Sequence, residues 1–229
     1  MTLNEILEGD ISRNVKKRNI NESLIKFKDR NTVWDRSSFK PLTRVSNDDK
    51  GEWGEDFIQN LISDTTELSV EWDGNSNTSN GDGIYDIKIN KKRTEVKTAT
   101  VGYDKEKGKI TNTYQHENIY DKMVKNEKGK WVADKDGDIV WDNLLLLDIK
   151  PEGFYLTHIE FNDMCFGDER HPILKKKSTR HLSAWKFDTS RAVLQRGLEN
   201  GYTIYVPVNS DGTYSTENIG EFFEKHFTT

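Results

Sequence analysis

The sequence has little of what disulfide-stabilised or membrane-spanning proteins require. It contains one cysteine, Cys165, so no disulfide can form within the chain. Its longest aliphatic run, Leu144–Leu147, is far shorter than the roughly 20 apolar residues of a membrane-spanning helix. The first ten residues lack the basic segment and apolar core of a secretion signal. We therefore expect a cytoplasmic protein that does not cross a membrane.

Apolar residues are also few, at 33% of 229 residues against 32% charged residues. Six Trp, eight Tyr and ten Phe nevertheless argue against a disordered chain. With only four prolines and no Pro- or Ser-rich linker, the length corresponds to one domain. We expect a single domain over residues 1–229, made of a basic N-terminal extension (1–50), a core (51–160) and a C-terminal part (161–229).

An excess of positive charge is absent too, since 34 Lys and Arg stand against 39 Asp and Glu, a net charge of −5. Residues 13–50 nevertheless hold 11 basic and 5 acidic residues, and residues 175–196 hold 7 and 1. These two segments sum to +12, so the remainder carries −17. Such local concentrations fit a polyanion-binding cleft, although Lys-rich runs also form ordinary solvated faces.

Hydrophobic periodicity predicts a helix, three strands, a second helix and further strands, with two more helices toward the end of the chain. The helices are expected at residues 51–63, 114–125, 191–199 and 217–227. Strands are expected at residues 68–72, 85–90, 94–99, 144–149, 154–159 and 202–206, and a loop at residues 73–83. Residues 126–143 have the pattern of a small hairpin that turns at Asp136–Gly137. Ser190 and Gly201 have the residue types of an N-cap and a C-terminal stop for the third helix.

The stretch from Asp86 to Lys97 contains an aspartate, eight intervening residues and then Glu-Val-Lys. If its two strands are joined by a turn at Lys91–Lys92, Asp86, Glu95 and Lys97 share one side of the hairpin. Two carboxylates beside an ammonium can form a divalent-metal site, because Mg²⁺ prefers a few hard oxygen ligands and retained waters. The alternative is a surface hairpin stabilised by cross-strand ion pairs.

A helix with an acidic residue, a strand, an Asp-containing strand and a Glu-x-Lys strand follow one another in this sequence. With the predicted helix and strand that come next, this order resembles the PD-(D/E)xK nuclease superfamily, to which restriction endonucleases belong. The resemblance covers roughly residues 51–160. It implies an α/β fold with a mixed sheet and a restriction-endonuclease-like αβββαβ core, here with added helices and a small β-hairpin excursion.

The resemblance also implies roles for individual residues. Asp86, Glu95 and the Val96 backbone carbonyl correspond to the ligands of Mg²⁺, Lys97 to the motif lysine, and Glu55 to the helix acid that joins the metal site. Tyr85 stands where the family name implies proline. Asp82 competes with Asp86 as the first acid, and Glu52 competes with Glu55.

The function implied is a Mg²⁺-dependent type II restriction endonuclease. Such an enzyme hydrolyses phosphodiester bonds in double-stranded DNA at a specific site, leaves 5′-phosphate ends and normally acts as a homodimer. No Gly-rich phosphate loop follows a strand, so no nucleotide cofactor is expected. Two alternatives remain: a repair or recombination nuclease of the same superfamily that selects structure or damage, and a catalytically silent DNA-binding module.

Residues 173–196 form the candidate DNA-contacting segment, because basic side chains are concentrated there. Gln115 is added because several branches of the superfamily have a glutamine after the core hairpin. The candidate DNA-binding residues are Lys175, Lys176, Lys177, Arg180, Lys186, Arg191 and Gln115.

Overall fold

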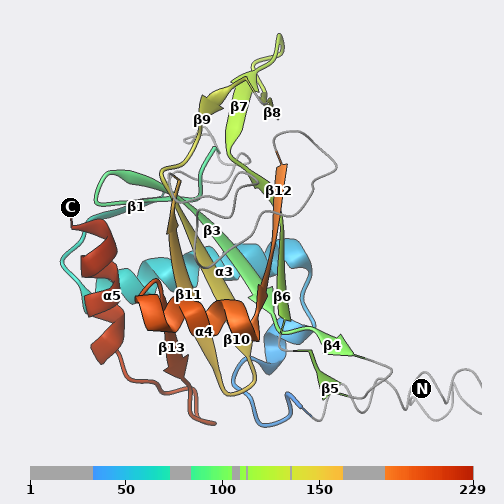
Figure 1. Cartoon of the computed structure of the whole chain (residues 1–229), viewed down its shortest axis with the longest axis vertical. Coiled ribbons are helices and arrows are strands. Elements are labelled where there is room, and N and C mark those ends of the chain that lie inside the picture. Colours follow the sequence, from blue (N-terminus) through green and yellow to red (C-terminus); the bar gives the residue numbers. More distant parts are fainter. Residues whose placement is uncertain are drawn as a thin grey trace, which may run out of the picture.

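The computed structural model describes residues 33–72, 84–104, 109–111, 113–134, 136–161 and 184–228. Over these residues the protein is a mixed α/β structure with a six-stranded mixed sheet and three α-helices (Figure 1). The α/β class expected from the sequence is thereby confirmed. None of the described helices has the length and apolar character needed to span a membrane.

The six-stranded sheet is antiparallel except at its centre. Its strands are, in spatial order, β1 (Val70–Trp72), β2 (Ile87–Ile89), β3 (Lys92–Thr100), β10 (Asn143–Lys150), β11 (Gly153–Glu160) and β13 (Thr203–Pro207). β3 and β10 are parallel, and every other neighbouring pair is antiparallel. A parallel pair requires a long crossover connection, and here the crossover consists of residues 101–142.

Helix α3 (Asn47–Thr65) precedes the sheet and contains the predicted helix at residues 51–63. Ser46 caps its N-terminus in a capping box with Asp49: each side chain accepts a hydrogen bond from the other residue's backbone N–H. Ile58 and Leu61 are buried on its inner side, as the helical spacing predicts. A short 3₁₀ helix, η1 (Lys40–Thr43), leads into α3.

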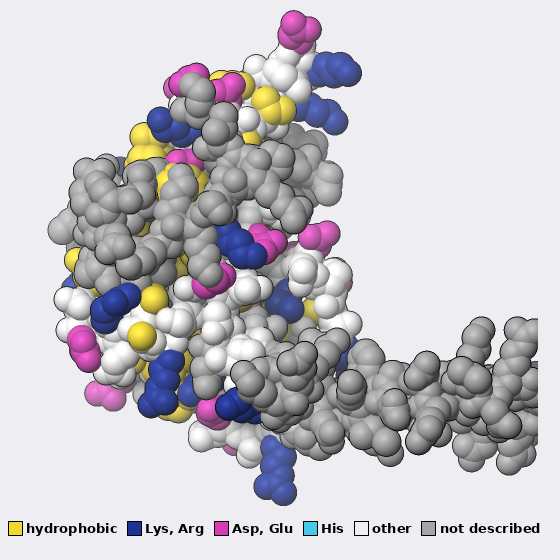
Figure 2. Space-filling model, turned by 45° about the vertical axis from the view of Figure 1, so that its right-hand side comes forward, with side chains coloured by type: hydrophobic (Ala, Val, Ile, Leu, Met, Phe, Trp, Pro, Cys, Tyr) yellow, Lys and Arg dark blue, Asp and Glu magenta, His cyan; other side chains and the backbone are white. Residues whose placement is uncertain are grey.

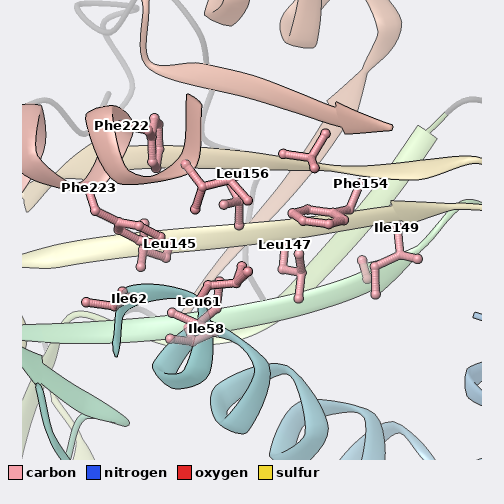
Figure 3. Close-up of a cluster of buried hydrophobic side chains, with 14 of the residues drawn as sticks. Ile58, Leu61, Ile62, Leu145, Leu147, Ile149, Phe154, Leu156, Phe222 and Phe223 are labelled. Carbon is pink, nitrogen blue, oxygen red and sulfur yellow. The ribbon is translucent and has the colours of Figure 1, made fainter. Parts of the chain in front are cut away.

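The run of leucines in β10 is explained by burial on both faces of the sheet. Leu145 and Leu147 belong to a large hydrophobic cluster that includes side chains of α3, whereas Leu144 and Leu146 belong to a second cluster. Because successive side chains of a strand point to opposite faces, a strand covered on both sides has a continuous apolar sequence. Figure 3 shows the first cluster, in which α3 contributes Ile58 and its neighbours.

Two helices complete the fold near the C-terminus. α4 (Arg191–Asn200) is capped by Ser190, whose hydroxyl accepts a hydrogen bond from Val193 N, and it ends at Gly201 in the left-handed conformation. α5 (Glu217–Phe227) adds Phe222 and Phe223 to the first hydrophobic cluster (Figure 3). The predictions of both helices and of the cap residues are confirmed, because their signals are local to the sequence.

The helix predicted at residues 114–125 is wrong. This segment forms β6 (Thr113–Tyr120) and β7 (Lys122–Lys125), and β6 pairs with β12 (Ala184–Ser190) in a two-stranded ribbon. Its pairing is irregular, with a positive φ of 57° at Asn118. As a result, the next buried residue after His116 is Ile119, three positions later and not two. That three-residue step imitates a helical period, while the strand's partner lies about 70 residues away in the sequence.

The excursion between β6 and β10 has three strands rather than two. β7 pairs with β8 (Trp131–Ala133) on one side and with β9 (Asp138–Ile139) on the other. The hairpin therefore turns at residues 126–130, and the predicted hairpin turn at Asp136–Gly137 is instead the connection from β8 to β9. Two short strands, β4 (Tyr103–Asp104) and β5 (Lys109–Ile110), form a further pair near the end of β3.

A glycine sets the distance between α3 and the sheet. A Cβ added at Gly54 would collide with Thr98 Oγ1 of β3 and lie 2.9 Å from Thr98 Cβ. Gly51, one turn earlier in the same helix, has nothing within 4 Å of such an atom. Gly54 is thus required for close packing of helix and sheet, whereas Gly51 is not.

We expect Gly54→Ala to lower the free energy of unfolding by about 1–3 kcal/mol, because the helix must move away from β3. Gly51→Ala is the matched control and should raise it by about 0.5–1 kcal/mol, since alanine favours the helix. Urea unfolding followed by tryptophan fluorescence measures both. Equal effects of the two substitutions would contradict the close contact at Gly54.

Candidate functional site

The hairpin of β2 and β3 turns at Asn90 and Lys91, one residue earlier than predicted. Both residues have positive φ, 47° and 71°, as a two-residue type I′ turn requires. Ile89 is consequently paired with Lys92. The predicted turn at Lys91–Lys92 is wrong because asparagine tolerates the left-handed conformation better than lysine does.

The shift changes the pairing by two residues and therefore preserves which side chains share a face. Ile87 and Val96 are buried in the first hydrophobic cluster. Asp86, Glu95 and Lys97 alternate with them and lie together at the opposite side of the hairpin, where ion pairs join them.

Lys97 is the centre of this group. Its ammonium forms an ion pair with Glu95 and lies 3.8 Å from Asp86 Oδ2. The side chains of Lys97, Asp86 and Glu95 are 24%, 20% and 10% exposed. The three charged groups are thus largely enclosed by the protein and still reachable from solvent.

Asp86 lies immediately before β2, where the backbone ladder to β3 begins. Its N–H donates to Thr94 O at 3.2 Å, and its Oδ2 accepts a hydrogen bond from Val96 N at 2.7 Å. The carboxylate therefore takes the place of a strand partner for Val96. Because the N–H and C=O of one strand residue face the same neighbour, the Val96 carbonyl is directed to the same side of β3.

Glu55 comes from α3, and the missing side chain at Gly54 allows its part of the helix to approach β3. Burial and the Asp86 carboxylate raise the pKa of Glu55 to about 8, and Lys97 opposes this effect. The competing residue Glu52 is exposed on the same helix. The competing Asp82 lies outside the described residues.

The electrostatics of the group follow from burial and from an excess of acid. Burial, then the charge of Asp86, raises the pKa of Glu95 to about 7. Burial alone would lower the pKa of Lys97, but Glu95, Asp86 and Glu55 outweigh it and raise this pKa above its ordinary value. Three carboxylates share one ammonium, so a divalent cation would offset the remaining negative charge.

The hairpin carries oxygen donors of the kind that Mg²⁺ prefers. Among the residues that the structure describes, no three His, Cys, Asp or Glu side chains are arranged to hold a metal ion, so a zinc-type cage is not formed there. Asp86 and Glu95 provide two carboxylates, with the Val96 carbonyl facing the same side. Mg²⁺ commonly binds proteins through one or two carboxylates and keeps several waters.

The predicted DNA-contacting residues lie on other elements. Gln115 is exposed on β6 opposite Asp188 of β12, and Lys186 of β12 forms an ion pair with Glu117. Arg191 is exposed at the first position of α4. The remaining predicted contacts lie outside the described residues: Lys175, Lys176, Lys177 and Arg180.

A buried polar network between the main sheet and the ribbon was not expected from the sequence. Asp148 of β10 accepts a hydrogen bond from Thr189 at 2.7 Å and lies 2.7 Å from His116 Nε2. All three side chains are buried, and they join β10 to β12 and β6. A charged residue inside the run Leu144–Ile149 was the available signal, since a buried carboxylate requires partners.

A polar cavity of about 300 Å³ beside α4 was not expected either, because its lining comes from residues distant in sequence. Lys150 lies at this cavity, with its ammonium 4.3 Å from the ring centroid of Tyr205 and 3.2 Å from Glu152. The cavity is lined by Tyr114, Lys150, Tyr155, Arg191, Leu194, Gln195 and Leu198.

No protein-family model, curated protein or solved structure matches the chain. A functional proposal therefore depends on the chemistry of the site itself. The relevant features are the two carboxylates, the lysine between them and the third acid on α3.

The raised pKa of Glu95 predicts that the fold loses stability as the pH rises. The folded chain favours the protonated side chain, so this stabilisation is full below the ordinary glutamate pKa of 4.5 and is lost as the pH passes about 7. Glu95→Gln mimics the protonated form. Both proteins should lose stability between pH 4.5 and 8.5. The loss in the free energy of unfolding should be smaller for Glu95→Gln than for the wild type, by on the order of 1–2 kcal/mol.

Urea unfolding in the presence of EDTA measures this difference without interference from metal ions. Glu52→Gln removes an exposed carboxylate from α3 and serves as the control. If Glu95→Gln and the wild type lose stability equally over this pH range, the raised pKa is contradicted.

Proposed function

We propose that the protein is a metal-dependent DNA endonuclease, most specifically a type II restriction enzyme. The observation that carries the proposal is the placement of Lys97 between Glu95 and Asp86 on a buried hairpin. An ordinary surface hairpin would expose such ion pairs, and here Glu95 is only 10% exposed. Enclosed charges of this kind are costly and are typical of functional sites.

Asp86, Glu95 and the Val96 carbonyl would hold Mg²⁺, and Glu55 adds a carboxylate close by. When bound, Mg²⁺ supplies Lewis-acid polarisation and lowers the pKa of a water. The Lys97 ammonium would orient that water and offset the negative charge that develops on the phosphate.

In the proposed reaction the oxygen of water bonds to phosphorus and the bond from phosphorus to the 3′ oxygen breaks. The leaving oxygen ends with a proton as a 3′-hydroxyl, and the other end keeps a 5′-phosphate. One site cuts one strand. Cutting both strands of a symmetric sequence therefore requires two copies, and we include a homodimer in the proposal.

Incubating the protein with unmethylated plasmid and Mg²⁺, followed by sequencing of the ends, tests the function. We expect discrete fragments with a common end sequence, and no cutting in EDTA. Scattered cuts at junctions or lesions would favour a repair nuclease instead. If the wild type cuts no DNA or RNA substrate, the nuclease proposal is wrong and a binding module is favoured.

The site assignment has its own test. Lys97→Gln and Asp86→Asn should each reduce the cleavage rate by about a hundredfold or more, the usual effect of removing one group that stabilises developing charge. Lys88→Gln is the matched control, because Lys88 follows Asp86 by two residues and interacts with the exposed Glu71 at 3.8 Å. Undiminished cutting by both site variants would reject this site.

A further inference from the structure

The strands β7, β8 and β9 form an arm, residues 122–139, that projects from the body of the protein (Figure 1). Figure 2 shows it standing clear of the main mass, with basic side chains near its outer end. From Lys122 to the start of the turn at residue 126, β7 extends roughly 13 Å at the usual rise of a strand. Neither the core nor the candidate site requires such a projection.

The root of the arm is fixed to the strand that carries the candidate site. Arg93 of β3 donates to both Asp142 carboxylate oxygens, at 2.7 and 3.1 Å, and its Nη1 donates to Ile139 O at 2.7 Å. The Arg93 backbone N–H also donates to Asp142, at 2.9 Å. Arg93 precedes Glu95 by two residues, so the arm and the site are held in one rigid frame.

A second contact supports the root from the other side. Trp141, fully buried, donates its indole N–H to Tyr120 O at 2.9 Å, which ties the segment leaving the arm to the end of β6, the strand that leads into it. Met123 of β7 packs against the second hydrophobic cluster. The lower half of the arm is therefore anchored in the core, and only its outer half projects.

The charge of the arm is divided along its length. Lys125, Lys128 and Lys130 are exposed at the outer turn, with Glu127 the one acidic residue among residues 125–131. The acidic residues Asp134 and Asp136 lie on the connection from β8 to β9, and Asp138 begins β9, all nearer the root. The outer turn therefore carries a net positive charge on a protein whose formal charge is −5.

From these features we infer that the arm inserts into a groove of double-stranded DNA and contacts phosphates through Lys128 and Lys130. The inference rests on the proposed function, and it names the surface that holds the substrate beside the site. In the described part of the arm, β9 pairs only with Lys122 and Met123, so the outer part of the arm is the two-stranded hairpin of β7 and β8. A two-stranded ribbon fits the major groove, which is about 12 Å wide. Because Arg93 fixes the arm to β3, a groove contact sets the position of the DNA relative to Glu95 and Lys97.

The alternative partner for the arm is a second copy of the chain, because the apolar side chains of Val132 and Ile139 are about 40% exposed. Two identical turns that each carry three lysines would repel one another in a symmetric contact. A polyanion has the complementary charge, so the observations favour DNA.

The salt dependence of DNA binding tests the inference. With the Asp86→Asn background in EDTA, which prevents cutting, affinity for a duplex is measured at several salt concentrations. The slope of log K against log salt concentration is negative. The double substitution Lys128→Gln with Lys130→Gln should reduce its magnitude by about 1.8, for two lost phosphate contacts. Lys109→Gln with Lys225→Gln removes the same charge from other elements and should leave the slope unchanged.

Amide hydrogen exchange provides a second readout at the arm itself. Adding duplex should slow exchange in residues 122–133 of the protein with native lysines. An unchanged slope in the arm variant, no binding of duplex, or slowing that depends on protein concentration and not on DNA would each overturn the inference.

The two proposals fail separately. Binding that depends on the arm, without cleavage of any substrate by the wild type in Mg²⁺, would reject the nuclease and keep the arm as a DNA-contacting surface. Cleavage by the wild type, with binding unaffected in the arm variant, would reject the arm and keep the nuclease.

Discussion

The parallel pairing of β3 with β10 is the interaction on which the core and the candidate site both depend. β10 is buried on both faces, so its position is fixed by two hydrophobic clusters at once. Its ladder with β3 aligns Leu144 with Glu95 and Leu146 with Lys97. The charged side chains are consequently positioned by a strand that cannot slip without exposing its leucines.

This arrangement explains how the protein can hold several buried charges. The surrounding apolar packing fixes the backbone, so Lys97, Glu95 and Asp86 stay together despite the burial that raises the pKa of Glu95 and Glu55. Such a site has more acidic than basic groups and therefore lacks positive charge. A divalent cation or the basic side chains of a partner can relieve that deficit, whereas a neutral ligand cannot.

Much of the fold is predictable where the signals are local. α3, α4 and α5 follow from helical spacing, and α4 also from its cap residues. The shared face of Asp86, Glu95 and Lys97 follows from strand alternation, which is unchanged by the error in the turn. Strands whose partners lie far away in sequence are not predictable in this way. β6 has the sequence pattern of a helix because its bulge imitates a helical period, and its pairing with β12 crosses about 70 residues.

The parts of the site that the sequence does not predict have the same cause. The contact of Arg93 with Asp142 joins residues 49 apart, and the partners of Asp148 come from two other strands. Neither can be inferred from a single segment. From the sequence, Glu55 can be chosen as the helix acid only by resemblance. In the structure, Glu55 is partly buried near Asp86 and Lys97, whereas Glu52 is exposed.

The hydrogen bond from Val96 N to Asp86 Oδ2 gives the site a spectroscopic reporter. An amide proton that donates to a carboxylate resonates at a frequency that depends on the charge of that carboxylate. Any cation or proton that takes electron density from Asp86 would therefore move the Val96 amide resonance, even with no substrate present. Occupancy of the site could thus be followed in solution through a backbone atom that takes no part in the chemistry.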